Sequence, residues 1–244
     1  MRRVAKVILV DCGNSNSVGF VMKPFLRAHG VNGLPRLALT HGDLRHVGGV
    51  TLLATFFPIE QLVTSSVRFN SPVYRAAVKE FQKTPGCGRT VNRGDEMGVW
   101  TVLHPNPDDH FPDADDNALV LRGEFAGTRV LLLSDLGRPG QDALLKRQAD
   151  LRSEIVVACL PESGEPAGDA LLDAIQSELV IITDSEFPAT KRASAKLRER
   201  LERRGVPVIF TREAGAVEIS LRKNRWEAFT TSGIRASRSP DSLK

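Results

Sequence analysis

The chain has 244 residues, of which 41% are hydrophobic and 25% charged, and its formal net charge is +4. This composition is typical of a soluble globular protein and excludes a disordered or fibrous chain. No apolar run reaches the roughly 18 to 20 residues that a membrane-spanning helix needs, so the sequence predicts no transmembrane segment.

Short aliphatic and β-branched runs alternate with helical stretches along the chain, which predicts an α/β fold. The predicted strands cover residues 4–10, 37–40, 50–55, 99–104, 118–125, 128–134, 155–160, 179–183, 206–211, 216–221 and 226–230. The predicted helices cover residues 21–29, 72–81, 140–146, 168–176 and 188–204. A tight hairpin at Ala126-Gly127 makes the sheet mixed rather than parallel. We therefore predict one domain over residues 1–231, with mixed sheets flanked by helices, and a disordered tail over residues 232–244.

Cysteine content and charge distribution bear on location and partners. The three cysteines form no CxxC pair, so the sequence predicts neither a disulfide framework nor a thiolate zinc site. A reducing compartment fits best, and the sequence alone predicts a cytoplasmic location. Residues 189–244 hold 14 Lys and Arg against 6 Asp and Glu, a net +8 that leaves −4 for residues 1–188. Such a basic region is either a surface that faces nucleic acid or an ordinary solvated face, and both interpretations stay open.

Several predicted strands end in a residue that can bind a metal or accept a proton. These residues are Asp11, His41, Asp135 and Asp184. In α/β folds, ligands bind outside the carboxyl ends of the strands, so the four residues are candidates for one shared site. Each aspartate, taken alone, is equally explained as a turn former or helix N-cap.

The densest cluster of such residues is the turn that holds His41, Asp43, Arg45 and His46, directly before the pair Gly48-Gly49. Imidazole and carboxylate are the ligands of zinc, manganese and iron centres, and a turn of this length can direct several side chains at one ion. The turn therefore predicts a metal site, with a surface turn that carries two histidines as the alternative.

At this turn the chain resembles the metallo-β-lactamase superfamily, whose signature is HxHxDH followed by two glycines, and more closely its ComEC variant, HxDxDH. Residues 11–14 resemble the DxG turn that precedes the signature, and residues 116–121, 131–135 and 211–217 resemble later motifs in the family's order. The resemblance implies a metallo-β-lactamase-like αββα sandwich and a metal-dependent phosphodiesterase or nuclease linked to DNA uptake. The family's opening strands, with the motif DVGQGDA, are not found before Val4, so we expect the N-terminal strands to be truncated.

The chain also departs from the family pattern. Arg45 stands where the signature has a metal-binding carboxylate, and a guanidinium cannot bind a cation. The family's histidines after the strands at 155–160 and 179–183 are missing. The resemblance leaves His41, Asp43, His46 and Asp135 as metal ligands for at most one zinc or manganese ion, with Glu162, Asp184 or Asp116 as substitutes.

Three functions follow from these residues. In the first, the ion activates a water for attack on a phosphodiester, Asp135 orients that water, and Arg45 counters charge on a phosphate oxygen. In the second, the domain is a pseudoenzyme in which Arg45 pairs with Asp43 or Asp135. It binds single-stranded DNA through the basic helix over residues 191–204. In the third, it is an assembly module for a membrane competence channel encoded elsewhere. The resemblance would place the domain outside the inner membrane, in contrast to the cytoplasmic prediction.

A few residues have a weaker claim to the site. His104 and His110 flank a loop rich in Pro and Asp, and each is a candidate for a missing ligand. Trp100 and Trp226 are predicted to pack in the protein rather than to stack on bases. Cys12 is predicted to be a buried thiol rather than a nucleophile, because no partner base can be assigned to it.

Overall fold

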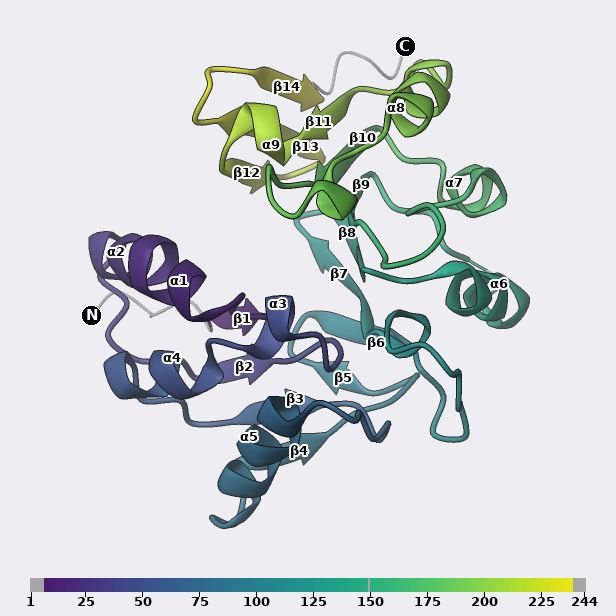
Figure 1. Ribbon diagram of the computed structural model, residues 1–244. Helices are drawn as coiled ribbons and strands as arrows, with labels where there is room; N and C mark the ends of the chain where they lie inside the picture. Colours follow the sequence, from purple (N-terminus) through teal and green to yellow (C-terminus); the bar gives the residue numbers. More distant parts are fainter. Residues whose placement is uncertain (1–6, 149, 239–244) are drawn as a thin grey trace. The chain divides into compact units, whose positions relative to one another are not determined.

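The computed structural model describes residues 7–148 and 150–238 (Figure 1). Contacts divide the chain into two compact units, which are described separately: unit 1 holds residues 1–92 and 105–110, and unit 2 holds residues 93–104 and 111–244. Within the described ranges, every helix is too short or too polar to cross a membrane.

Unit 1 is built on a parallel sheet of four strands in the order β1-β2-β3-β4. The strands are β1 (Ile8–Val10), β2 (Arg36–Ala38), β3 (Leu62–Thr64) and β4 (Gly88–Thr90). The helical segments are α1 (Ser15–Ser17), the π-turn η1 (Val18–Met22), α2 (Lys23–Ala28), α3 (Leu44–Val47), α4 (Val50–Phe56) and α5 (Pro72–Gln82). Because β1 and β2 are parallel neighbours, their carboxyl ends meet at one edge of the sheet. Asp11 and His41 follow those two ends, as the sequence predicted.

The strand predicted at residues 50–55 is wrong, because this segment is helix α4. Val50 and Leu53 are buried while Thr51 and Ala54 are exposed, which is the spacing of a helix face. A short apolar run does not distinguish the two structures by itself. The N-cap of α4 is Gly49, where a Cβ atom would lie 2.4 Å from Val18 Cγ2 and 2.9 Å from the Asn14 carbonyl oxygen. Glycine therefore lets α4 start against the turn that follows β1.

Unit 2 is built on a seven-stranded sheet in the order β11-β10-β9-β8-β7-β6-β5. Its strands are β5 (Glu96–Met97), β6 (Trp100–His104), β7 (Val120–Phe125), β8 (Thr128–Ser134), β9 (Ile155–Cys159), β10 (Leu179–Thr183) and β11 (Val208–Phe210). The hairpin β7-β8 is antiparallel, and β8 to β11 are parallel. The predicted hairpin and mixed sheet are confirmed.

Both faces of this sheet are buried, and the side chains of successive residues in one strand point to opposite faces. Val180 and Ile182 pack with helices α6 (Arg138–Arg147), α7 (Asp169–Ile175) and α8 (Ala195–Glu202), which lie along one face in Figure 1. Leu179 and Ile181 pack with Trp226 on the other face, against the antiparallel sheet of β12 (Val217–Arg222), β13 (Arg225–Thr230) and β14 (Arg235–Arg238). Burial on both faces explains why β10 is apolar throughout.

Two predictions about the C-terminal part are corrected. The helix predicted at 188–204 is shorter: the 3-10 turn η3 (Ala189–Lys191) comes first, and α8 begins after the N-cap Ser194. The disordered tail predicted from Ser232 is wrong for β14, which pairs with β13. Residues 239–244 lie outside the described residues, and the prediction of one domain over residues 1–231 stays a prediction.

Candidate metal centre

Two histidines of unit 1 are held by one polar network at the ends of β1 and β2. Nδ1 of His46 lies 2.8 Å from Oδ2 of Asp11, and the other oxygen of Asp11 accepts a hydrogen bond from the Thr40 backbone N–H at 2.8 Å. The Thr40 hydroxyl donates to Asp11 Oδ2 at 2.7 Å and lies 2.9 Å from Nδ1 of His41. Because this hydroxyl donates to Asp11, it accepts from Nδ1–H of His41. In its neutral form, each imidazole therefore carries its proton on Nδ1.

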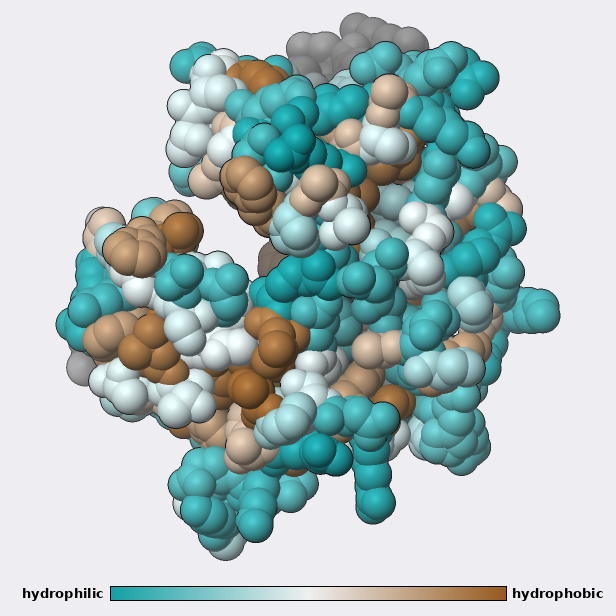
Figure 2. All heavy atoms as spheres, in the orientation of Figure 1, coloured by the Kyte–Doolittle hydropathy of each residue, from teal (hydrophilic) through white to brown (hydrophobic). Residues whose placement is uncertain are grey.

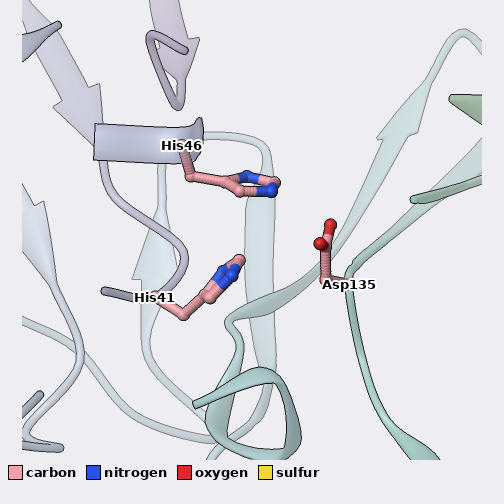
Figure 3. Close-up of side chains that lie close together, drawn as sticks. All are labelled: His41, His46 and Asp135. Carbon is pink, nitrogen blue, oxygen red and sulfur yellow. The ribbon is translucent and has the colours of Figure 1, made fainter. Parts of the chain in front are cut away.

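This network orients both rings. Their centroids are 4.4 Å apart and their planes are inclined by 52° (Figure 3). Since Nδ1 of each ring contacts the network, Nε2 is the nitrogen that faces away from it. A histidine that binds a metal usually donates its second ring N–H to a carboxylate or similar acceptor, and this outer bond raises its basicity. The Nδ1 contacts of His41 and His46 in unit 1 follow this outer-bond pattern.

The backbone is strained at two of the three strand ends that carry carboxylates. Asp11 has φ of 57° and Ser134, directly before Asp135, has φ of 53°. Non-glycine residues seldom adopt this left-handed conformation, and such strain gathers at functional sites. No pattern in the sequence indicated it.

Asp43, a predicted ligand, is engaged within its own turn. Its Oδ1 accepts the Arg45 backbone N–H at 2.7 Å, and its Oδ2 accepts Nε and Nη2 of Arg45 at 3.1 and 2.6 Å. Burial raises the pKa of Asp43, but the hydrogen bonds and positive charge of Arg45 outweigh burial and lower the pKa overall. The carboxylate is thus ionised at neutral pH, and its contribution to stability is lost as the pH falls through this lowered pKa. Arg45 therefore pairs with Asp43, one of the two partners expected for it.

Asp135 lies in unit 2, just after β8, where Figure 3 shows its carboxylate. Its Oδ2 accepts a hydrogen bond from Nζ of Lys191 at 2.8 Å, and both side chains are buried. The sequence predicts Lys191 within a basic helix that either faces nucleic acid or is solvated, and this buried contact is not predicted. Nothing in the local pattern indicated it, because Lys191 is 56 residues away along the chain.

The three proposed substitute ligands have other surroundings. Asp184 is fully buried and is bound by Arg198, Arg212 and two backbone N–H groups. Asp116 is buried beside the Gly140 N–H; burial and its neighbours Asp113 and Asp115 raise its pKa, despite that N–H, which lowers it. Glu162 is exposed. None of the three has the outer-shell arrangement of the histidines.

The surroundings of His104 and His110 do not favour a role as metal ligand for either residue. Nε2 of His104 lies 2.8 Å from the Asp116 carbonyl oxygen, and its buried ring packs near Phe111. This is the environment of a core histidine. His110 is exposed in unit 1.

The basic C-terminal region is less available to nucleic acid than its charge implies. Hydrophilic residues gather over α8 in Figure 2, yet two arginines of α8 and one just after it pair with carboxylates of the same unit. Arg198 pairs with Glu213, Arg200 with Asp169, and Arg204 with Asp173.

The two tryptophans pack in unit 2, as predicted. Trp226 is buried and donates to Glu178 at 2.9 Å, and Trp100 packs edge-on to Phe125. Trp226 therefore offers no open face for base stacking, and Trp100 is half-buried.

Cys12 is expected to be chemically inert in the folded protein. It is fully buried, and burial, with the charge of Asp11 next, raises its pKa to about 12 in spite of a backbone hydrogen bond from Gly49. Iodoacetamide at pH 8 should modify Cys12 about a thousandfold more slowly than an ordinary thiol, because the thiolate reacts. Peptide mass mapping can measure this, with the half-buried Cys87 as internal control. Equal rates at Cys12 and Cys87 would contradict the buried thiol.

Comparison with known proteins adds the family context. The model of the metallo-beta-lactamase superfamily matches residues 2–210. Two curated relatives are similar: ComE operon protein 3 of Bacillus subtilis (strain 168), 24% identical over 86% of this chain, and competence protein ComA of Neisseria gonorrhoeae, 22% identical over 91%. The chain spans 27% and 30% of the length of these relatives. The resemblance and the α/β fold class predicted from the sequence are confirmed.

Solved structures show weaker similarity. A metallo-beta-lactamase with a HARLDQ motif from Cronobacter sakazakii (Enterobacter sakazakii) has a TM-score of 0.40 at 17% identity, over 62% of each chain. A diphosphatase from the PhnP family has a TM-score of 0.46 at 11% identity, over 96% of this chain and 81% of that one.

Proposed function

Since this chain belongs to the metallo-beta-lactamase superfamily, we propose that it is a metal-dependent hydrolase of phosphodiesters that holds one Zn²⁺ or Mn²⁺ ion. The proposed ligands are His41, His46 and Asp135, which are side chains of the type that could hold an ion.

One observation carries this proposal: Asp11 and Thr40 hold Nδ1 of both imidazoles. Such an outer shell costs strain at Asp11 and serves no obvious packing purpose, whereas it is what ligating histidines need. The donor set of two imidazoles and a carboxylate suits Zn²⁺ and is acceptable to Mn²⁺.

When bound, the ion would supply Lewis-acid activation of a water and of a phosphate oxygen. Asp135 would orient the attacking water. Arg45, whose side chain is 32% exposed, would contact a phosphate oxygen while Asp43 holds its guanidinium in place. Because the family resemblance implies a role in DNA uptake, single-stranded DNA is the first substrate to test. We further propose that the domain acts beside a membrane competence channel at the extracytoplasmic face.

A second candidate function is a metal-free binding or assembly module. It is favoured by two ion pairs, Arg45 with Asp43 and Lys191 with Asp135, because each places a cation on a carboxylate that the family resemblance assigns to metal. Such a domain would act on a DNA or channel partner by binding alone.

Metal content and its removal distinguish the two functions. Under the first, purified protein contains about one Zn²⁺ or Mn²⁺ per chain by elemental analysis, and it cleaves bis-p-nitrophenyl phosphate and a labelled single-stranded oligonucleotide. Dialysis against EDTA abolishes cleavage, and the metal restores it. Protein that takes up neither metal at millimolar concentration and cleaves neither substrate would reject the hydrolase and leave the binding module.

A further inference from the structure

Lys191 is a buried cation that contacts one oxygen of a buried carboxylate. Its side chain is 10% exposed and that of Asp135 is 1% exposed, and Nζ lies 2.8 Å from Oδ2. Nζ also donates to the Leu160 carbonyl oxygen. Lysine is seldom buried unless it is paired, because desolvation of its charge is costly. The pair is therefore a specific feature of unit 2 and not an incidental surface contact.

The fold brings these groups together at the ends of three neighbouring strands. Asp135 follows β8, Leu160 follows β9, and Lys191 lies in the segment after β10. That segment is fixed by backbone hydrogen bonds from Lys191 N–H to the Pro188 carbonyl and from Ser185 N–H to the Lys191 carbonyl. The position of the ammonium is thus set by the sheet and its connections.

We propose that Lys191 is a positioning residue that takes Oδ2 of Asp135 and so limits the metal site to one ion. The inference rests on the proposed function. An ion shared through Oδ2 would lie within a few ångströms of the ammonium, and like charges at that distance repel strongly in a poorly solvated site. The same contact fixes the carboxylate rotamer, so that Asp135 presents its other oxygen in a constant direction.

A purely structural ion pair has a different consequence. It would stabilise unit 2 without any effect on metal affinity or stoichiometry. The number of ions bound and their affinity therefore separate the two roles, whereas a change in thermal stability alone does not.

The test compares Lys191→Met, which removes the charge at similar length, with Lys196→Met, a lysine exposed on α8. Metal-stripped full-length proteins are titrated with Zn²⁺ by calorimetry, and bound metal is counted by elemental analysis. We expect Lys191→Met to bind Zn²⁺ about tenfold more tightly or to take up a second ion, because a neighbouring positive charge is lost. Lys196→Met should behave as the wild type.

Each outcome bears on a different proposal. If the wild type binds one ion and Lys191→Met binds it with the same affinity and number, the inference about Lys191 is overturned and the metal site stands. If only Lys191→Met binds metal, the inference stands and the hydrolase function falls. If neither binds metal, both fall. Should Lys191→Met not fold, as judged by near-ultraviolet circular dichroism, Lys191→Gln keeps a donor for Asp135 without the charge and serves in its place.

Discussion

Replacing Asp11 with alanine is expected to weaken Zn²⁺ binding by about 10- to 100-fold, the usual effect of removing an outer-shell partner of a metal ligand. Asp11 accepts hydrogen bonds from His46 Nδ1, from the Thr40 hydroxyl and from the Thr40 backbone. Without the carboxylate, the rings lose their fixed tautomer and orientation. Calorimetric titration of metal-stripped protein measures the change.

Asp11→Asn is the matched control. Asparagine keeps an oxygen acceptor and tolerates the positive φ of this position, so backbone strain is unchanged. It should therefore retain more of the affinity than alanine. An Asp11→Ala protein that folds normally and binds Zn²⁺ as the wild type does would show that the network orients no metal ligand.

Replacing Asp184 with alanine is expected to lower the free energy of unfolding by about 3 to 5 kcal/mol, the cost of breaking a buried ion pair from one side. The fully buried carboxylate accepts the Arg212 N–H at 2.8 Å and the Ala193 N–H at 3.3 Å, and it lies 3.5 Å from Arg198 Nη2. Without the carboxylate of Asp184, these donors would lose their acceptor at the carboxyl end of β10. Urea unfolding followed by circular dichroism gives the free energy.

Asp169→Ala is the comparison for this substitution. Asp169 also pairs with two arginines, Arg200 and Arg204, but its side chain is 57% exposed, and exposed pairs contribute at most about 1 kcal/mol. Metal affinity should not change in either protein. A decrease in Zn²⁺ affinity in Asp184→Ala, at unchanged stability, would instead make Asp184 the substitute ligand that the sequence allowed.

The sequence was most informative where local chemistry and strand position coincide. His41, His46 and Asp11 follow strands or lie in one short turn, so their grouping in unit 1 could be inferred from residue types and parallel-strand geometry. The pairing of Arg45 with Asp43 was one of two open alternatives, and only the N-cap geometry of α3 decides it.

The two incorrect predictions have a common physical cause. In both places, tertiary contacts determine the structure. The sequence predicts Lys191 as part of a basic helix, but its partners Asp135 and Leu160 follow other strands. Residues 50–55 were read as a strand, although the close approach at Gly49 and the burial of Val50 and Leu53 favour a helix. Neither contact is encoded in a local pattern.

Strand β14, which lies in the region predicted to be a disordered tail, joins the two sheets of unit 2. Arg238 lies opposite Trp226 in the β13-β14 pairing, and both side chains contact Glu178, just before β10. The last described residues thereby tie the small sheet to the large one. A protein shortened at Ser232 would expose the open edge of β13. The unpaired backbone groups of this edge can form hydrogen bonds with a strand of another molecule. We therefore expect such a shortened chain to self-associate, and preparations for metal analysis should extend at least to Arg238.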